Sequence, residues 1–530
     1  MIRFLKDINL RLKLLLVLIV LTFLYGFYID FFEGPKPIHE WRKADCLSIT
    51  YNYMKGEPFF EPKTNLILEN GNRNAVSEFP IIYFLMGKLW SVIGQNEFLY
   101  RLLSFVLLLL GIILFATVVQ YYLKSQKYTI IYSVFMFSSP ILIGYAHNFI
   151  PNPISFALNL IAGFFVFQFL QNNKLYGLIG FFVFSTLAIL IKITSILVFM
   201  SFIGAFIFYE LFDNNYFWRK YKIKISLLSG SFILTLALVA AWYYYAIYYN
   251  TKYDSHLFST TIRPIWEIPA EKRNEIFWHI INTMINYAYH RVIVFALIIF
   301  GVVALFSRSI NAFLKWLIVM SIGALFSYLI LWYWVFDVHD YYLIEILFVF
   351  NVLFFIFLYK INSFFSFLDL KKINLALYFF IIFVVLHAYT CSWVRFSANP
   401  KLIVNNIFLK KRDIDTWRWF NYDYGINLKT LQSKSDEIKK IIQPSDTILC
   451  LRDYSPNVHL YTLGRIGYSK FLYNGFSDRE AIVDAYKRGA RYVVFLGSEE
   501  ERAKIPYSDY VAYQYERIYI FDLKPYKKIQ

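Results

Sequence analysis

The segment Pro37-Ile-His-Glu-Trp-Arg-Lys-Ala-Asp-Cys-Leu-Ser-Ile-Thr50 decides how the rest of the chain is interpreted. It follows the first long apolar run, over residues 12–32, and it places Asp45 among basic and aromatic side chains just beyond that run. Gly56 and Pro58 end a helical pattern of apolar side chains formed by Leu47, Tyr51 and Met54. We therefore predict a short amphipathic helix that lies along a membrane surface and holds a carboxylate at the boundary.

The composition indicates a membrane protein. Of the 530 residues, 58% are hydrophobic, and several apolar runs reach the ~20 residues that cross a bilayer core. These runs predict a polytopic α-helical membrane protein. The first run is too long for a cleaved signal peptide, and no small-residue cleavage site follows it. Many of the Lys and Arg residues behind the net charge of +17 lie in short loops between the runs, which is typical of membrane topology and not of nucleic-acid binding.

The positions of the basic residues also predict the topology. Arg3 and Lys6 precede the first run and place the N-terminus in the cytoplasm. About 11 transmembrane helices follow from the apolar runs, at residues 12–32, 99–122, 128–146, 154–170, 175–191, 194–212, 225–248, 291–306, 316–336, 343–360 and 374–394. The amphipathic segment 80–94 is short for a span, so we expect a second helix at the outer interface. If it crossed the membrane, every later basic loop would move to the outer side.

Two domains are expected from these patterns. Residues 1–395 form the transmembrane domain, whose first outer loop, 33–98, contains Asp45. Residues 396–530 are more polar and alternate between strand-like runs, such as Thr447-Ile-Leu-Cys-Leu451, and helix-like stretches. We expect a small α/β domain on the outer side of the membrane.

Asp45 is the first candidate for chemistry. An isolated acid after a span is usually a solvated loop residue, but here Glu40 and Arg42 lie on the same short segment and Trp41 can anchor it. A carboxylate at such a boundary can act as a general base toward an acceptor hydroxyl or amine. Because an ordinary Asp has a pKa of about 4, Asp45 would accept the proton late, or burial would raise its pKa.

The order of motifs in this part of the chain resembles a known family. An Arg-x-x-Asp motif (Arg42-Lys-Ala-Asp45) follows the first span, and Glu78-Phe-Pro-Ile-Ile-Tyr83, Gly94 and Arg101-Leu102 come after it. This order resembles the GT-C membrane glycosyltransferases, in particular glycosyltransferase family 39, the bacterial relatives of protein O-mannosyltransferases, and the lipid A aminoarabinose transferases. The resemblance covers residues 10–395. It implies a GT-C fold, a polyprenyl-phosphate sugar donor, and a motif aspartate, here Asp45, that activates the acceptor.

Further residues could hold the phosphate of such a donor. Lys192 lies between two apolar runs, where it is either a snorkelling lysine or, as the resemblance implies, a contact of the lipid phosphate. The stretch His339-Asp340-Tyr341-Tyr342 is either an aromatic belt with a polar turn or part of the site, because His and Tyr can hydrogen-bond phosphate. We take the phosphate-binding candidates to be Lys192, Arg101, His339 and Tyr342. The candidates for the acceptor or sugar site are Glu40, Arg42, Glu78, Asp340 and Tyr341.

A bound metal is not predicted. In the family resembled, an acid often precedes the second Pro of the loop His147 to Pro153, and this chain has Asn152 there. Hard cations prefer carboxylates, so a divalent ion is not supported. A second acid beside Asp45 would have to be Glu40, Glu78 or Asp340. The three cysteines show no metal or redox spacing.

The resemblance implies a glycosyltransferase of a bacterial inner membrane, and the topology then predicts that its C-terminal domain lies in the periplasm. The expected partners are a polyprenyl-phosphate sugar donor, membrane lipid, and a glycan, lipid or protein acceptor. The alternative is a transporter or flippase of lipid-linked substrates without glycosyl transfer, which would place charged groups deep in several spans. A structural membrane protein with a sensory outer domain is a third possibility.

Overall fold

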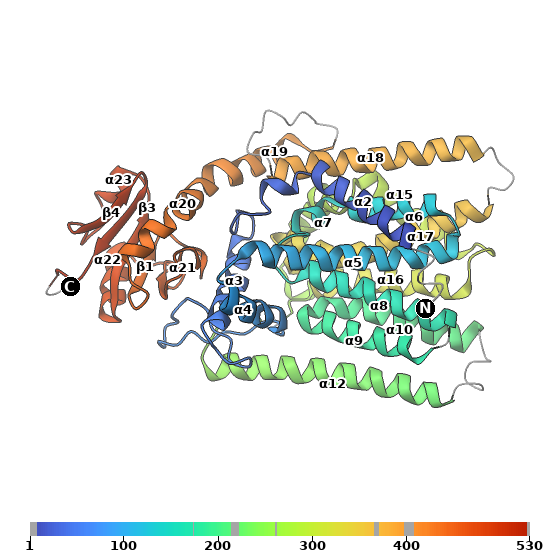
Figure 1. Ribbon diagram of the computed structural model, residues 1–530, viewed down its shortest axis with the longest axis horizontal. Coiled ribbons are helices and arrows are strands. Elements are labelled where there is room, and N and C mark those ends of the chain that lie inside the picture. Colours follow the sequence, from blue (N-terminus) through green and yellow to red (C-terminus); the bar gives the residue numbers. More distant parts are fainter. Residues whose placement is uncertain are drawn as a thin grey trace. The chain divides into compact units, whose positions relative to one another are not determined.

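The computed structural model describes residues 8–172, 174–213, 222–259, 262–364, 370–396 and 408–526 (Figure 1). Their packing divides the chain into two compact units. The first, called here the helical unit, comprises residues 1–31, 101–242 and 261–414. The second, called the mixed unit, comprises residues 32–100, 243–260 and 415–530. The domain boundary expected after residue 395 stays a prediction. The packing adds that residues 33–98, which were expected to be the first outer loop and keep that name here, belong to the same unit as the C-terminal segment.

The helical unit is built from apolar helices joined by short connections. Their bounds are α2 Ile8–Leu24, α5 Glu97–Leu123, α6 Gln126–Phe137, α7 Pro140–Tyr145, α8 Asn152–Asn172, α9 Leu175–Ile191, α10 Ile196–Phe208, α12 Lys222–Lys252, α13 Ala270–His279, α14 Ile285–Ala288, α15 Arg291–Leu305, α16 Ala312–Leu331, α17 Leu343–Phe364 and α18 Leu370–Phe396. The first residues of α5 and the end of α12 belong to the mixed unit. The polytopic helical architecture expected from the sequence is confirmed.

The number of full-length spans differs from the expected eleven. Within the described ranges, seven helices are long and apolar enough to cross a membrane, or eight if the pair Ala270–Ala288 and Arg291–Leu305, bent by 92°, counts as one span. The expected span 128–146 is divided into α6 and α7. Its break lies at Ser138 and Ser139, because Pro140 supplies no N–H to continue the helix and holds Ser139 extended. The short segment 80–94 is the 13-residue helix α4, Ile81–Ile93.

Helix α17 lies at the centre of the helical unit. It packs against α6, α8, α15 and α16, and 89% of the apolar window within Asp340–Asn362 is buried. A helix that is apolar on all sides is expected to be enclosed by other helices. The residues at the start of α17 are therefore held in a rigid setting.

The mixed unit contains a five-stranded sheet. The strands are β1 Thr447–Leu451, β2 Gly467–Ser469, β3 Ala490–Leu496, β4 Val511–Tyr515 and β5 Ile518–Asp522, in the order β2-β1-β3-β5-β4. Strand β1 pairs in parallel with β2 and β3, whereas β5 is antiparallel to both β3 and β4. The helices of this unit include α3 Glu40–Met54, α4, α20 Gly425–Ile441, α21 Val458–Leu463, α22 Asp478–Lys487 and α23 Glu499–Arg502 (Figure 1). Helix α19, Lys411–Arg418, comes just before α20. The small C-terminal α/β fold expected from the sequence is confirmed.

Alternation along the strands gives the sheet two buried faces. On β1, Leu449 and Leu451 join the core around α22, whereas Ile448 and Cys450 join the core around α20 and α21. Two residues of the first outer loop, Leu66 and Leu68, belong to this second core. The loop thus forms part of the hydrophobic interior of the α/β fold.

Backbone pairing joins the same loop to the sheet. Leu66 forms a parallel bridge with Gly467 of β2, in which Ile67 N donates to Gly467 O at 2.8 Å and Gly467 N donates to Asn65 O at 3.1 Å. Strand β2 would otherwise be an open edge of the sheet. A Cβ at Gly467 would lie 2.0 Å from the carbonyl oxygen of Ile448, so glycine is required at this crowded position.

This crowding predicts that Gly467→Ala destabilises the mixed unit. We expect a loss of about 1–3 kcal/mol, since the new methyl group must displace the backbone of β1. Thermal unfolding of the purified chain would measure it. Gly323→Ala is the control, because a Cβ there meets nothing within 4 Å and Gly323 lies inside α16. Equal stability of the two variants would contradict the prediction.

Candidate active site

Asp45 lies on the second turn of α3, and α3 is enclosed rather than exposed along one face. Residues Lys43 to Thr50 are all buried, and Asp45 retains only 6% of its exposed surface. Helix α4 crosses α3 closely because Gly87 has no Cβ, which would lie 2.7 Å from Thr50 O. On another side, Ala44 packs with Leu428 of α20 and Val458 of α21. Asp45 is therefore not a solvated loop acid.

Arg42 and Glu78, two of the candidates for the acceptor or sugar site, form an ion pair in the same unit as Asp45. Arg42, one turn before Asp45, donates to Glu78 Oε1, and Glu78 lies just before α4. Tyr83 OH donates to Glu78 Oε2 at 3.4 Å and lies 3.3 Å from Cys46 Sγ. The separation of 36 residues between Arg42 and Glu78 is closed by the α3–α4 packing. Glu40 begins α3 and is also buried.

Asp45 has a partner that the sequence analysis did not identify. Asn457 Nδ2 donates to Asp45 Oδ1 at 2.8 Å. Asn457 is fully buried and follows β1 in the loop that leads to α21. Its position after the carboxyl end of a parallel strand, where functional groups of α/β sheets gather, is the only sequence signal that points to it.

The surroundings of Asp45 suit proton transfer near neutral pH. Burial raises its pKa from 3.8 to about 6; Arg42 and the hydrogen bond from Asn457 oppose this shift, while Glu78 and Asp453 add to it. Burial also raises the pKa of the neighbouring Cys46 thiol to about 11, so Cys46 stays protonated at neutral pH. Of these two groups, Asp45 is the one that can accept a proton under physiological conditions.

In the helical unit, Lys192 and Tyr342 come together as phosphate-binding candidates. Lys192 is extended between α9 and the short 3-10 turn Ile193–Ser195, and its Nζ donates to Tyr342 OH at 3.2 Å. Nζ also lies 4.3 Å from the centre of the Tyr342 ring. His339 and Tyr341 are in ring contact with Tyr342, at centroid distances of 6.1 and 5.0 Å. This cluster is called here the lysine–tyrosine cluster.

Glu345 is a buried acid near this cluster that the sequence analysis missed. Asn152, which stands where the family resembled often has an acid, donates from Nδ2 to Glu345 Oε1 at 2.9 Å. Glu345 interacts electrostatically with Lys192 and lines a pocket between α10, α16 and α17 whose wall is otherwise apolar except for Ser201 and Tyr328. An ionisable residue within an apolar run was a signal that could have drawn attention to Glu345.

Arg101 and Asp340 are held by other partners. Arg101 Nη1 donates to His147 O at 2.8 Å, and its guanidinium lies 4.3 Å from the centre of the Phe149 ring. Asp340 accepts from Tyr145 OH at 2.5 Å and from Arg395 Nη2 at 2.8 Å, one partner on each oxygen. Both oxygens of Asp340 are thus engaged in hydrogen bonds, and its charge is paired with that of Arg395. No group of three or more His, Cys, Asp or Glu side chains that could hold a metal occurs among the residues described.

Comparison of the structure with solved structures identifies the fold. ArnT from Cupriavidus metallidurans bound to undecaprenyl phosphate superposes with a TM-score of 0.59 and 12% identity, covering 96% of this chain and 97% of that one. The same protein in the apo state gives 0.58 and 11%, with the same coverage. The chain has the GT-C fold. It is a multi-pass membrane protein.

A third structure is more distant. The archaeal oligosaccharyltransferase AglB from Archaeoglobus fulgidus, in complex with an inhibitory peptide and a dolichol-phosphate, has a TM-score of 0.47 and 11% identity, covering 91% of this chain and 69% of that one. No family model matches the sequence. No curated protein matches it either.

Proposed function

We propose that this GT-C protein transfers a sugar from a polyprenyl-phosphate donor to an acceptor at the outer face of a bacterial inner membrane, with Asp45 as the general base. The observation that carries the proposal is the buried Asp45 carboxylate, whose pKa of about 6 suits a base. The ArnT structure of the same fold holds undecaprenyl phosphate, which supports a donor of this lipid class. The N-terminus would then lie in the cytoplasm and the α/β domain in the periplasm.

The reaction would be a single displacement. An acceptor hydroxyl or amine attacks the anomeric carbon, and its proton passes to Asp45. The bond between the anomeric carbon and the phosphate oxygen breaks, and its electron pair leaves with polyprenyl phosphate. This leaving group is already a stable anion, so cations near it need only stabilise the charge that develops. One displacement inverts the anomeric configuration.

The remaining candidate residues divide between the two substrates. Lys192, Tyr342 and His339 of the lysine–tyrosine cluster would bind the donor phosphate, and Arg101 would add a further cation. Tyr341 packs in the same cluster and could stack on the sugar. In the mixed unit, the Arg42–Glu78 pair would orient the acceptor beside Asp45, with Glu40 at the start of the same helix.

The first prediction concerns Asp45 itself. Asp45→Asn keeps the shape of the side chain but cannot accept a proton, so we expect transfer to fall by about 10²–10⁴-fold. The assay uses the purified protein with a panel of polyprenyl-phosphate sugars and candidate acceptors. Asp254→Asn is the control, since its side chain is 75% exposed. Full activity of Asp45→Asn would refute the assignment of the base, and movement of labelled lipid without transfer would favour a flippase.

The second prediction concerns pH. A base acts in its ionised form, so kcat/KM of the wild type should rise with pH to a plateau, with a midpoint near the Asp45 pKa of about 6. Below that midpoint the rate should fall about tenfold per pH unit. The measurement is the initial rate between pH 4.5 and 8 at low substrate concentration. A plateau that extends down to pH 4.5 would contradict a buried base of this kind.

The third prediction concerns the donor. Lys192→Met should weaken the binding of undecaprenyl phosphate by about tenfold, because it removes a charge-assisted hydrogen bond to the phosphate. Binding is measured on the purified protein in detergent, so it does not require the acceptor to be known. Lys174→Met, an exposed lysine before α9, is the control. Equal affinity in both variants would remove Lys192 from the phosphate site.

A further inference from the structure

We propose that the C-terminal α/β fold completes the base site, with Asn457 as a positioning residue that holds the Asp45 carboxylate in its reactive orientation. The inference deepens the proposed function and rests on Asp45 being the base. It assigns a catalytic purpose to a part of the chain that lies outside the sequence motifs of the transferase. The contacts that support it all lie within the mixed unit.

The orientation of the Asn457 side-chain amide is determined by its neighbours. Its Oδ1 accepts from the backbone N–H groups of Asn65 and Leu66, each at 3.1 Å. Backbone N–H groups can only donate, so the oxygen of the amide must face them. The Nδ2 group is thereby directed to Asp45 Oδ1, at 2.8 Å. A rotated amide would lose these two hydrogen bonds and present an oxygen to a carboxylate.

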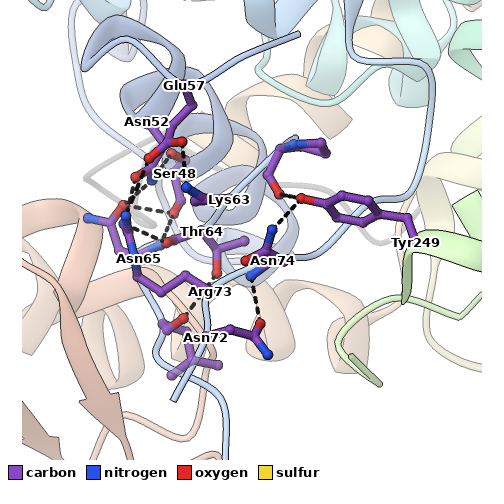
Figure 2. A network of polar contacts seen from close by, with 12 residues as sticks. Ser48, Asn52, Glu57, Lys63, Thr64, Asn65, Asn72, Arg73, Asn74 and Tyr249 are labelled. Atoms are coloured by element: carbon purple, nitrogen blue, oxygen red, sulfur yellow. Dashed lines mark hydrogen bonds and ion pairs between the residues drawn. The ribbon is translucent and has the colours of Figure 1, made fainter. Parts of the chain in front are cut away.

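The loop residue Asn65, whose backbone N–H contacts Asn457, is itself held by a network of polar contacts with α3 and its own loop (Figure 2). Asn65 N donates to Ser48 Oγ at 2.7 Å, and Asn52 Nδ2 donates to Asn65 Oδ1 at 2.9 Å, which fixes the loop to α3. On the other side, Asn65 Nδ2 donates to Arg465 O at 3.0 Å. Arg73 Nη1 donates to Asn52 Oδ1 at 2.7 Å, as Figure 2 shows, so the network extends into the rest of the loop.

The topology of the sheet explains why Asn457 is available for this task. Strand β1 has β2 on one side and β3 on the other, both parallel to it, so the chain reverses its direction of winding at β1. In α/β sheets, ligands bind outside the carboxyl end of the strand at such a point. Of the residues that follow β1, Asn457 contacts Asp45 of α3, and Asp453 acts electrostatically on the same carboxyl group.

Several charged or titratable groups face Asp45. Arg42 comes from its own helix, Glu78 from the segment before α4, and Asp453 from the loop after β1. The Cys46 thiol is also near, and His459 Nδ1 lies 3.8 Å from Asp453 Oδ2. Two groups of the α/β fold act on Asp45: the hydrogen bond from the uncharged Asn457 lowers its pKa, whereas the charge of Asp453 raises it. The α/β fold therefore acts on the base through two groups of opposite effect.

The test removes the hydrogen-bond donor of the Asn457 side chain, Nδ2, and keeps an oxygen in the place of Oδ1. Asn457→Asp retains an oxygen for the two backbone N–H groups but places a carboxylate against Asp45. We expect the midpoint of the pH–rate profile to rise by about one unit or more, so that kcat/KM below the wild-type midpoint falls about tenfold. The KM for the lipid donor should stay unchanged while kcat falls. Asp453→Asn should move the midpoint in the opposite direction.

A matched control separates positioning from stability. Tyr473→Phe removes a partly buried hydrogen bond to Asp484 elsewhere in the same fold, and should lower thermal stability without moving the pH midpoint. If Asn457→Asp fails to fold, Asn457→Ala removes the donor without adding charge and should shift the midpoint upward by less. A wild-type midpoint and kcat in either folded Asn457 variant, while Asp45→Asn is inactive, would overturn this inference alone. Full activity of Asp45→Asn would overturn it together with the proposed function.

Discussion

The mixed unit depends on the backbone pairing between residues 65–67 and Gly467. It fixes residues 65–67 at the edge of β2, while the packing of α3 against α4, α20 and α21 holds the earlier part of the same segment. The pairing extends the sheet by one strand-like segment and draws Leu66 and Leu68 into the core beside α20 and α21. It also brings the start of the loop, with Asp45, against the residues that follow β1. The glycine at position 467 lets β2 lie close to the backbone of Ile448 in β1, which a side chain there would prevent.

Burial then gives Asp45 its chemical character. Loss of water raises the free energy of the charged form, and the Arg42–Glu78 pair only partly compensates, because Glu78 cancels much of the charge of Arg42. A carboxylate that was solvated would remain too acidic to take a proton efficiently. The charge of Arg42 and, to a smaller extent, the hydrogen bond from Asn457 oppose the effect of burial and keep the pKa of Asp45 at about 6.

Much of the fold could be predicted because it depends on local patterns. Residues 175–191 were expected as a span and form α9 with the same bounds, and the run Thr447 to Leu451 is β1. The break at Ser139 was missed because an apolar run continues through it, although Pro140 marks it. The amphipathic pattern of α3 suggested one exposed face, but α4, α20 and α21 cover the helix from several sides.

Residues of the candidate site could be named from the sequence only where a motif or an unusual residue marks them, and their roles stay predictions. Asp45, Arg42 and Glu78 belong to the motif sequence, and Lys192 interrupts an apolar run. Asn457 carries no local mark: it is one amide among many, and its importance comes from a partner 412 residues earlier. Glu345 could not be found from the neighbours of Asn152 in the sequence, because the carboxylate that contacts Asn152 comes from α17, 193 residues later.

The long separation between Asp45 and Asn457 has a consequence for biosynthesis. The ribosome completes nearly nine-tenths of the chain before Asn457 is made. The segment that contains Asp45 therefore lacks this hydrogen-bond partner while the helices between them are synthesised. Contacts of such length form late in folding. A nascent or prematurely terminated chain would therefore carry the aspartate without its partner, and full reactivity would appear only in molecules whose synthesis has reached the last domain.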